Sequence, residues 1–279
     1  MAFDWFKGHG TENDFLVLPD HDGSVHGDLD PDFVAALCHR RRGLGADGVL
    51  RVIRAGAIAA LGVDVPGTGD GADPDVWFMD YRNADGSIAE MCGNGVRVFA
   101  RHLAQQGLVD LTEAFGVATR DGVKTVTVDE GGISVDMGEF ILGGSSEVVA
   151  DGRRWSATEV HTGNPHAVAI VDHVDDAGTL LEQPQFDTAV YPEGVNIEFV
   201  QEITPTHVRL RVHERGSGET RSCGTGACAA SVAFLDGRPG EVRVDVPGGT
   251  VHVTVTPDGR TILRGPAEIV AAGRMEWYA

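Results

Sequence analysis

One short motif occurs twice in the chain, and each copy leads into an apolar stretch of helical character. MCGNGVRVFARHL fills residues 91–103, and SCGTGACAASVAFL fills residues 222–235. A weaker pair, HGTENDFLVL at 9–18 and HTGNPHAVAIV at 161–171, places a polar loop containing Asn before a strand. An internal repeat of this length predicts that the chain folds as two copies of one structural unit.

The repeat assigns the 279 residues to two halves. We expect an N-terminal half over 1–130, a C-terminal half over 131–265, and a last segment, 266–279, that returns to the first half. The content of 38 Gly and 12 Pro favours turns and short strands over a helical bundle. Three helices are expected, at 31–41, 93–106 and 224–236, with strands through much of the remaining chain.

The helix expected at 224–236 has apolar residues almost all round, so it must be surrounded by protein and a curved sheet is expected to wrap it. Asp30 and Pro31 predict the start of the first helix, and Gly43 its end. The segment 62–75, rich in Gly, Pro and Asp, is expected to be a surface loop. The predicted fold class is α/β of the α+β type, with two pseudo-symmetric halves that each wrap a barrel-like sheet around a central helix.

Composition excludes several classes of partner. The chain carries 22 Lys and Arg against 42 Asp and Glu, a net charge of −20, so nucleic acid and anionic membranes would be repelled. The sequence shows neither a signal peptide nor a run of roughly 18 apolar residues that could span a membrane. We therefore expect a cytoplasmic protein that acts on a small molecule, with a homodimer left open.

The two repeat cysteines carry the predicted chemistry. Cys92 and Cys223 each stand where unpaired backbone N–H groups open a helix, and the positive end of the helix lowers the pKa of a thiol there. Two such groups related by internal symmetry suggest a pair of bases that face one substrate carbon from opposite sides, as a racemase or epimerase requires. Cys38 and Cys228 are expected to pack in the core.

No cofactor is expected. Pyridoxal phosphate needs a Schiff-base lysine, and the only lysines, Lys7 and Lys124, lie beside no phosphate-binding loop. GLGADG at 43–48 follows a helix, which is the wrong context for a dinucleotide site, and GTGACA at 224–229 is a weak alternative only. The Cys and His spacings fit no standard zinc pattern, so no metal is expected.

Polar residues near the cysteines suit a zwitterionic substrate. Glu214 could hold an ammonium group, and Arg215 could bind a carboxylate through two hydrogen bonds. Amide side chains in turn-rich surroundings could donate and accept hydrogen bonds; they are Asn13, Asn83, Asn164 and Asn196.

The sequence resembles the diaminopimelate epimerase family. The resemblance runs almost end to end; it includes KGHGTENDF (7–15), GADG (45–48), NADGSIAEMCGNGVRVFAR (83–101), TGNPHAV (162–168), GVNIEFV (194–200), ERGSGETRSCGTGACA (214–229) and VPGG (246–249). The two cysteine motifs and the ERG-x-GET stretch between them are specific, whereas GADG alone is not.

The resemblance implies a cofactor-independent epimerase that interconverts LL- and meso-diaminopimelate for lysine and peptidoglycan precursors, with its site in the cleft between two similar halves. It implies that Cys92 and Cys223 are the acid/base pair and that His166 and Glu214 orient the reacting end and tune the thiols. Substrate contacts are implied for Asn13, Asn83, Gly93, Asn94, Asn164, Asn196, Glu214, Arg215, Gly224 and Thr225.

Two positions depart from the family pattern. Glu12 stands where a glycine is common, and Gly48 stands where some members carry a substrate-contacting glutamine. The residues alone leave three other functions open: a proline racemase or hydroxyproline epimerase, a thiol redox or peroxide-sensing protein, and a binding module without catalysis.

Overall fold

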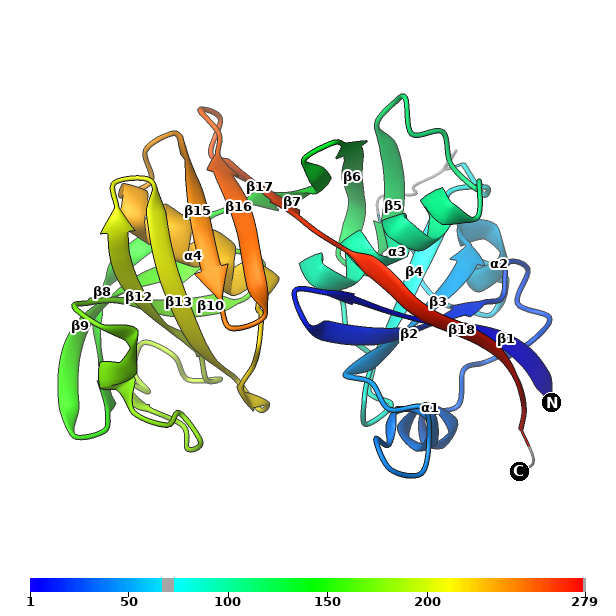
Figure 1. Cartoon of the computed structure of the whole chain (residues 1–279), viewed down its shortest axis with the longest axis horizontal. Coiled ribbons are helices and arrows are strands. Elements are labelled where there is room, and N and C mark those ends of the chain that lie inside the picture. The colour runs from blue at the N-terminus through cyan, green and yellow to red at the C-terminus, as the bar shows by residue number, and fades with distance from the viewer. Residues whose placement is uncertain (67–72, 278–279) are drawn as a thin grey trace. The chain divides into compact units, whose positions relative to one another are not determined.

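A computed structural model of the protein describes residues 1–66 and 73–277 (Figure 1). Much of the loop expected at 62–75 therefore lies outside the described residues. The chain forms two compact units. Unit 1 contains Met1–Val135 and the segment that begins at Pro266, and unit 2 is Asp136–Gly265.

The described residues of unit 1 form a sheet of eight strands and three helices. Its strands are β1 (Ala2–Gly10), β2 (Asn13–Pro19), β3 (Gly48–Arg54), β4 (Trp77–Asn83), β5 (Phe115–Thr119), β6 (Gly122–Asp129), β7 (Gly132–Glu139), which runs across the unit boundary, and β18 (Glu268–Glu276). Its helices are α1 (Pro31–Cys38), α2 (Ala55–Ala60) and α3 (Gly93–Gln105). The last strand, β18, lies antiparallel beside the first, with Glu276 opposite Ala2 (Figure 1).

Unit 2 repeats this design with one long helix. Its strands are β8 (Ile141–Ala150), β9 (Arg153–His161), β10 (Pro165–Val171), β11 (Gln185–Phe186), β12 (Asn196–Thr204), β13 (His207–Glu214), β14 (Gly218–Glu219), β15 (Gly240–Val246), β16 (Gly249–Val255) and β17 (Arg260–Gly265). Its helices are the short 3-10 helix η1 (Val174–Ala177) and α4 (Gly224–Leu235).

The strand pairings of the two units follow the same order. In unit 1, β2 pairs antiparallel with β1 and parallel with β3, and β3 pairs antiparallel with β4. In unit 2, β10 pairs antiparallel with β9 and parallel with β12, and β12 pairs antiparallel with β13. In each unit the central helix, α3 or α4, lies later in the chain. The strand after it pairs in parallel with an earlier strand: β5 with β4 in unit 1, and β15 with β13 in unit 2. The internal repeat in the sequence is therefore a repeat of topology.

The central helices are buried as the apolar pattern of α4 predicted. Strands β9, β10, β12, β13, β15, β16 and β17 all contact α4, so the sheet of unit 2 curves around it (Figure 1). Residues 226–232 of this helix are all buried. In unit 1, α3 contacts β1, β2, β3, β4 and β18. The mixed α+β architecture with a helix at the centre of each curved sheet is confirmed.

The structure differs from the expected elements in three places. The helix expected at 31–41 ends at Cys38, because His39 takes an extended conformation well before Gly43. The segment before Pro19 forms a hairpin of β1 and β2, whose turn residues Thr11 and Glu12 both have positive φ. Helix α2 was not expected at all.

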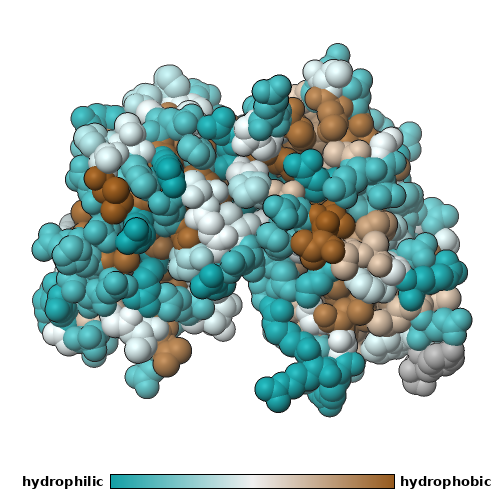
Figure 2. All heavy atoms as spheres, in the orientation of Figure 1, coloured by the Kyte–Doolittle hydropathy of each residue, from teal (hydrophilic) through white to brown (hydrophobic). Residues whose placement is uncertain are grey.

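The surface drawn in Figure 2 is mainly hydrophilic, with hydrophobic residues in small groups. Such a surface fits the large excess of acidic residues. Among the residues that the structure describes, no helix is both long enough and apolar enough to cross a membrane.

Candidate functional site

Cys92 is the N-cap of α3, and its sulfur accepts a hydrogen bond from the Gly95 N–H at 3.4 Å. The same sulfur lies 3.7 Å from Asn13 Oδ1, to which the thiol can donate. The amide of Asn94 donates to that Asn13 oxygen at 3.2 Å. The structure thus brings together three predicted site residues, because the start of α3 meets the start of β2.

A charged group that the sequence analysis missed holds Asn13 in place. Asn13 Nδ2 donates to Asp47 Oδ2 at 2.9 Å, and Arg40 binds Asp47 at 2.6 Å. Arg40 also binds Asp14 at 2.7 Å, and Lys7 lies 2.9 Å from Asp14. Burial raises the pKa of Asp14, but hydrogen bonds from Arg40 and Lys7 outweigh it and lower that pKa to about 2. Two quoted motifs contain members of this group: KGHGTENDF holds Lys7 and Asp14, and GADG holds Asp47.

Asn83 ends β4, at the same edge of the sheet as Asn13. It pairs with Gly48, which in turn pairs with Phe15 on β2. The amide of Asn83 donates to Ser87 Oγ at 3.0 Å. Gly48 is required by this packing, since a Cβ there would fall 2.5 Å from the carbonyl oxygen of Arg82. The glutamine found in some family members therefore has no room on this backbone.

Cys223 repeats the geometry of Cys92 in unit 2. It is the N-cap of α4, and its sulfur accepts from the Gly226 N–H at 3.3 Å. The sulfur is also 3.4 Å from Thr225 Oγ1. Only 6% of Cys223 is exposed. The predicted Gly224 and Thr225 form the first turn of α4, and the Thr225 carbonyl accepts from Thr162 Oγ1 at 3.2 Å.

Carboxyl groups lie near Cys223, and they change the direction in which its pKa is shifted. Glu214 accepts hydrogen bonds from Thr220 and from Cys223. Burial raises the pKa of the Cys223 thiol well above its ordinary value, and the charges of Glu214 and Glu198 raise it further. The helix start and the hydrogen bonds to the sulfur act in the opposite direction but are outweighed. The expectation of a lowered pKa at Cys223 was therefore wrong.

His166 lies on β10 and is fully buried. Its Nδ1 is 2.7 Å from Glu198 Oε1, and its Nε2 is 2.8 Å from Asn164 Oδ1. The resemblance implies a joint role for His166 and Glu214 in orienting the substrate and tuning the thiols, and the carboxyl group hydrogen-bonded to His166 is that of Glu198. Glu198 was missed because it stands in the apolar strand NIEFV.

Asn196 joins two further predicted residues. Its amide donates to the Pro165 carbonyl at 3.3 Å, and its Oδ1 accepts from the backbone N–H of Arg215 at 2.9 Å. The Arg215 side chain is exposed and donates to the Glu193 carbonyl at 3.0 Å. Unit 2 therefore gathers Asn164, His166, Asn196, Glu214, Arg215 and the start of α4 at one edge of its sheet.

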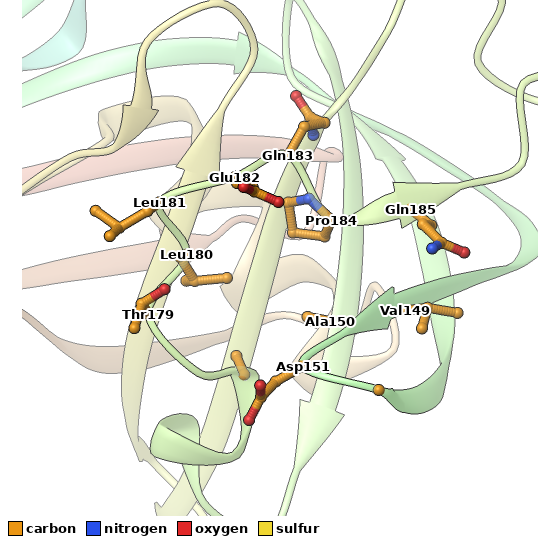
Figure 3. Close-up of a pocket in the computed structure, with 12 residues that line it drawn as sticks. Val149, Ala150, Asp151, Thr179, Leu180, Leu181, Glu182, Gln183, Pro184 and Gln185 are labelled. Carbon is orange, nitrogen blue, oxygen red and sulfur yellow. The ribbon is translucent and has the colours of Figure 1, made fainter.

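A separate surface cavity of about 400 Å³ lies elsewhere in unit 2 (Figure 3). It is lined by the turn between β8 and β9, from Val149 to Gly152, and by the segment 177–185 after η1. Leu181 at its rim is 81% exposed. None of the predicted site residues lines this cavity, so it carries no part of the site.

The lysines are engaged in ion pairs: Lys7 Nζ lies 2.9 Å from Asp14, and Lys124 Nζ lies 2.7 Å from Asp121. Within residues 1–66 and 73–277, no group of three or more His, Cys, Asp or Glu side chains is arranged to hold a metal ion.

Comparison with known proteins agrees with this arrangement. Residues 5–142 and 158–270 match the sequence profile of the family described as diaminopimelate epimerase. The diaminopimelate epimerase of Streptomyces coelicolor is 52% identical over 98% of this chain and 95% of its own length. That of Rhodococcus opacus is 50% identical over 99% and 98%. A phenazine biosynthesis protein of the PhzF family from Bacillus anthracis shares the fold, with a TM-score of 0.69, 15% identity and coverage of 99% and 100%. By sequence over nearly its whole length, the chain belongs to the diaminopimelate epimerase family.

Proposed function

We propose that this protein interconverts LL- and meso-diaminopimelate by moving a proton at one α-carbon, without a cofactor. The observation that carries the proposal is the pair of N-cap cysteines. Each sulfur accepts a backbone N–H from the third residue of its helix, at 3.4 Å for Cys92 and 3.3 Å for Cys223. One thiol related by a fold repeat to a second thiol supplies the two groups that stereochemical inversion requires.

The reaction needs one thiolate and one thiol. The thiolate removes the α-proton from one face of the carbon, and the thiol delivers its own proton to the opposite face. After the step the two sulfurs have exchanged protonation states, and no electron is gained or lost. Because the two titrations are coupled, the apparent pKa values belong to the pair.

The intermediate carbanion spreads its negative charge into the adjacent carboxylate. The first N–H groups of a helix have no partner within it, and the positive end of the helix dipole favours an anion there. We assign this role to the backbone of Gly93 and Asn94 in α3 and of Gly224 and Thr225 in α4. Such preorganised donors stabilise charge where it develops in the transition state.

The remaining polar side chains bind the parts of the substrate that do not react. Asn13 lies beside Cys92 and Asn164 contacts His166, while Asn83 and Asn196 lie at the same sheet edges as these residues. The exposed guanidinium of Arg215 suits the distal carboxylate, because arginine binds carboxylates through two parallel hydrogen bonds. A substrate with two identical ends must be held at the distal end for one centre to react.

The test is incubation of the protein with LL-diaminopimelate in deuterated water. Deuterium should enter one α-carbon while meso product forms. Cys92→Ala and Cys223→Ala should each lower the rate by about 10²-fold or more, since each removes one proton-transfer group. Cys38→Ala is the matched control, because Cys38 is the last residue of α1 and is buried in a hydrophobic core cluster that does not contain Cys92.

The outcome against the proposal is wild-type protein that incorporates no deuterium into either stereoisomer. Proline and hydroxyproline should be tested in parallel, because label in these amino acids alone would point to the shorter substrates.

A further inference from the structure

The two cysteines have the same backbone surroundings but different neighbours. A Cβ placed on Gly95 would lie 3.7 Å from the Cys92 sulfur and 3.2 Å from a methyl group of Leu50. A Cβ placed on Gly226 would lie 3.3 Å from the Cys223 sulfur and 2.8 Å from Glu198 Oε1. A carboxyl group therefore stands beside Cys223 where an apolar side chain stands beside Cys92.

Strand register shows that these positions are equivalent. Leu50 lies opposite Val17 in the parallel pair of β2 and β3, two residues after the pairing of Phe15 with Gly48. Glu198 lies opposite Val168 in the parallel pair of β10 and β12, two residues after the pairing of His166 with Asn196. The fold repeat thus matches Phe15 and Leu50 in unit 1 with His166 and Glu198 in unit 2.

His166 and Glu198 form a pair with no exposed surface. Their contact is 2.7 Å long, and both side chains are 0% exposed. Among the described residues, Glu198 Oε2 has no hydrogen-bond partner. A buried pair of polar side chains such as this one contributes little net stability, because the cost of desolvation offsets the attraction between them. The apolar pair in unit 1 shows that the fold does not need these two polar side chains.

We propose that Glu198, held by His166, is a positioning residue that keeps the proton on Cys223 and so makes the two repeat cysteines unequal in the resting enzyme. This inference rests on the proposed function, since it concerns the same two proton-transfer groups. It names Cys92 as the base for the stereoisomer whose α-proton faces Cys92 in the resting enzyme; the other stereoisomer reacts by the reverse step, from the form with a thiolate at Cys223.

The charges around Cys223 support this assignment. The titratable groups that face it are Glu214 at the end of β13, Glu198 on β12 and, behind Glu198, His166 on β10. Loss of the Cys223 proton would place a negative charge beside two carboxyl groups in a buried site. Burial and these two carboxyl groups raise the pKa of Cys223. Leu50 brings no charge to the equivalent position beside Cys92.

During turnover, Cys92 and Cys223 change their protonation states in a fixed order. In the resting form, the Cys92 thiolate takes the α-proton and the Cys223 thiol gives its proton to the other face. The product complex then holds a proton on Cys92 and a thiolate at Cys223. Solvent exchange must return the proton to Cys223 before the resting form is restored.

The decisive variant is Glu198→Leu, which gives unit 2 the residue that unit 1 already carries. Both proteins are treated with iodoacetamide across a pH series, and the peptides containing Cys92 and Cys223 are quantified separately by mass spectrometry. Only the thiolate reacts, so the profile of each peptide follows the thiolate fraction of one cysteine. Removing the Glu198 carboxyl group from beside the thiol should lower the Cys223 midpoint by about one to two pH units.

The Cys92 peptide in the same sample is the internal control, and its midpoint should move less than that of Cys223, since the coupling passes on only part of the change. Glu202→Leu, on the exposed end of β12, should leave both profiles unchanged. The inference is overturned if Glu198→Leu leaves the Cys223 midpoint in place or moves both midpoints equally. Should the variant fail to fold, the wild type still decides, because a Cys223 midpoint at or below that of Cys92 also overturns it.

Failure of the inference is distinguishable from failure of the proposed function. Alkylation profiles need no substrate, whereas deuterium incorporation by the wild type needs nothing of Glu198. A protein that epimerises diaminopimelate with unshifted profiles refutes only the role of Glu198.

Discussion

Alanine substitution of the two equivalent helix glycines, Gly95 and Gly226, should have unequal effects on stability. Both residues lie in the first turn of a central helix, where alanine is favoured over glycine by about 0.5–1 kcal/mol. The difference arises from what the new methyl group meets. At Gly95 the nearest atom is a Leu50 methyl at 3.2 Å, and this flexible side chain can move by a few tenths of an ångström.

At Gly226 the methyl group would lie 2.8 Å from Glu198 Oε1. That oxygen is held at 2.7 Å by His166 in a fully buried pair, so it cannot move without breaking the contact. Overpacking of this kind costs about 1–3 kcal/mol. After the helix propensity is subtracted, Gly226→Ala should destabilise unit 2 by about 0.5–2 kcal/mol, while Gly95→Ala should be close to neutral.

Differential scanning calorimetry measures this difference directly. For a unit of this size about 1 kcal/mol corresponds to roughly 4 °C in Tm, so Gly226→Ala should lower the transition by about 2–8 °C. Gly226→Ala in the Glu198→Leu background should recover part of the loss, because the rigid oxygen is gone. Equal Tm values for the two alanine variants would refute the argument from the Glu198 contact.

Three further predictions follow from local geometry. Glu12→Gly should stabilise the protein by about 0.5–1 kcal/mol in urea unfolding, because the φ of 63° at Glu12 is strained for any residue but glycine; a loss of stability would contradict this. Asp14→Asn should cost about 2 kcal/mol at neutral pH, and since the native pKa of Asp14 is lowered from 3.8 to about 2, the difference from the wild type should disappear as the pH falls from about 4 to 2. A difference that persists at pH 2 would exclude an ionic origin. Burial raises the pKa of Cys38 to about 12, so this thiol should resist iodoacetamide at pH 9, and rapid labelling there would show that it is accessible.

Elements with a local start signal were predictable from the sequence. Asp30 caps α1 through a hydrogen bond to the Phe33 N–H, and the two Cys-Gly motifs open α3 and α4 as expected. The turn at Thr11 and Glu12 was not predictable, because its left-handed residues are not the Asn and Gly that usually mark a two-residue hairpin. Helix α2 has only six residues and no side-chain cap.

The site was predictable at the cysteines and less so around them. The repeated motif placed both thiols at helix starts, which depends only on local sequence. The role of Glu198 depends on the parallel pairing of β10 with β12, which brings together residues 32 positions apart in the chain. For the same reason the pKa of Cys223 could not be judged from its helix alone, since the carboxyl groups that oppose the helix come from distant strands.

The pairing of β18 with β1 affects the order in which the protein can fold during synthesis. The N-terminal amine donates to the Trp277 carbonyl at 2.8 Å, so the first residue of unit 1 is bound by a residue that is translated after the whole of unit 2. Unit 2 is complete once Gly265 has left the ribosome, whereas β1 has an unpaired edge until the final strand emerges. The nascent chain must therefore keep that edge from aggregating while the whole of unit 2 is being made.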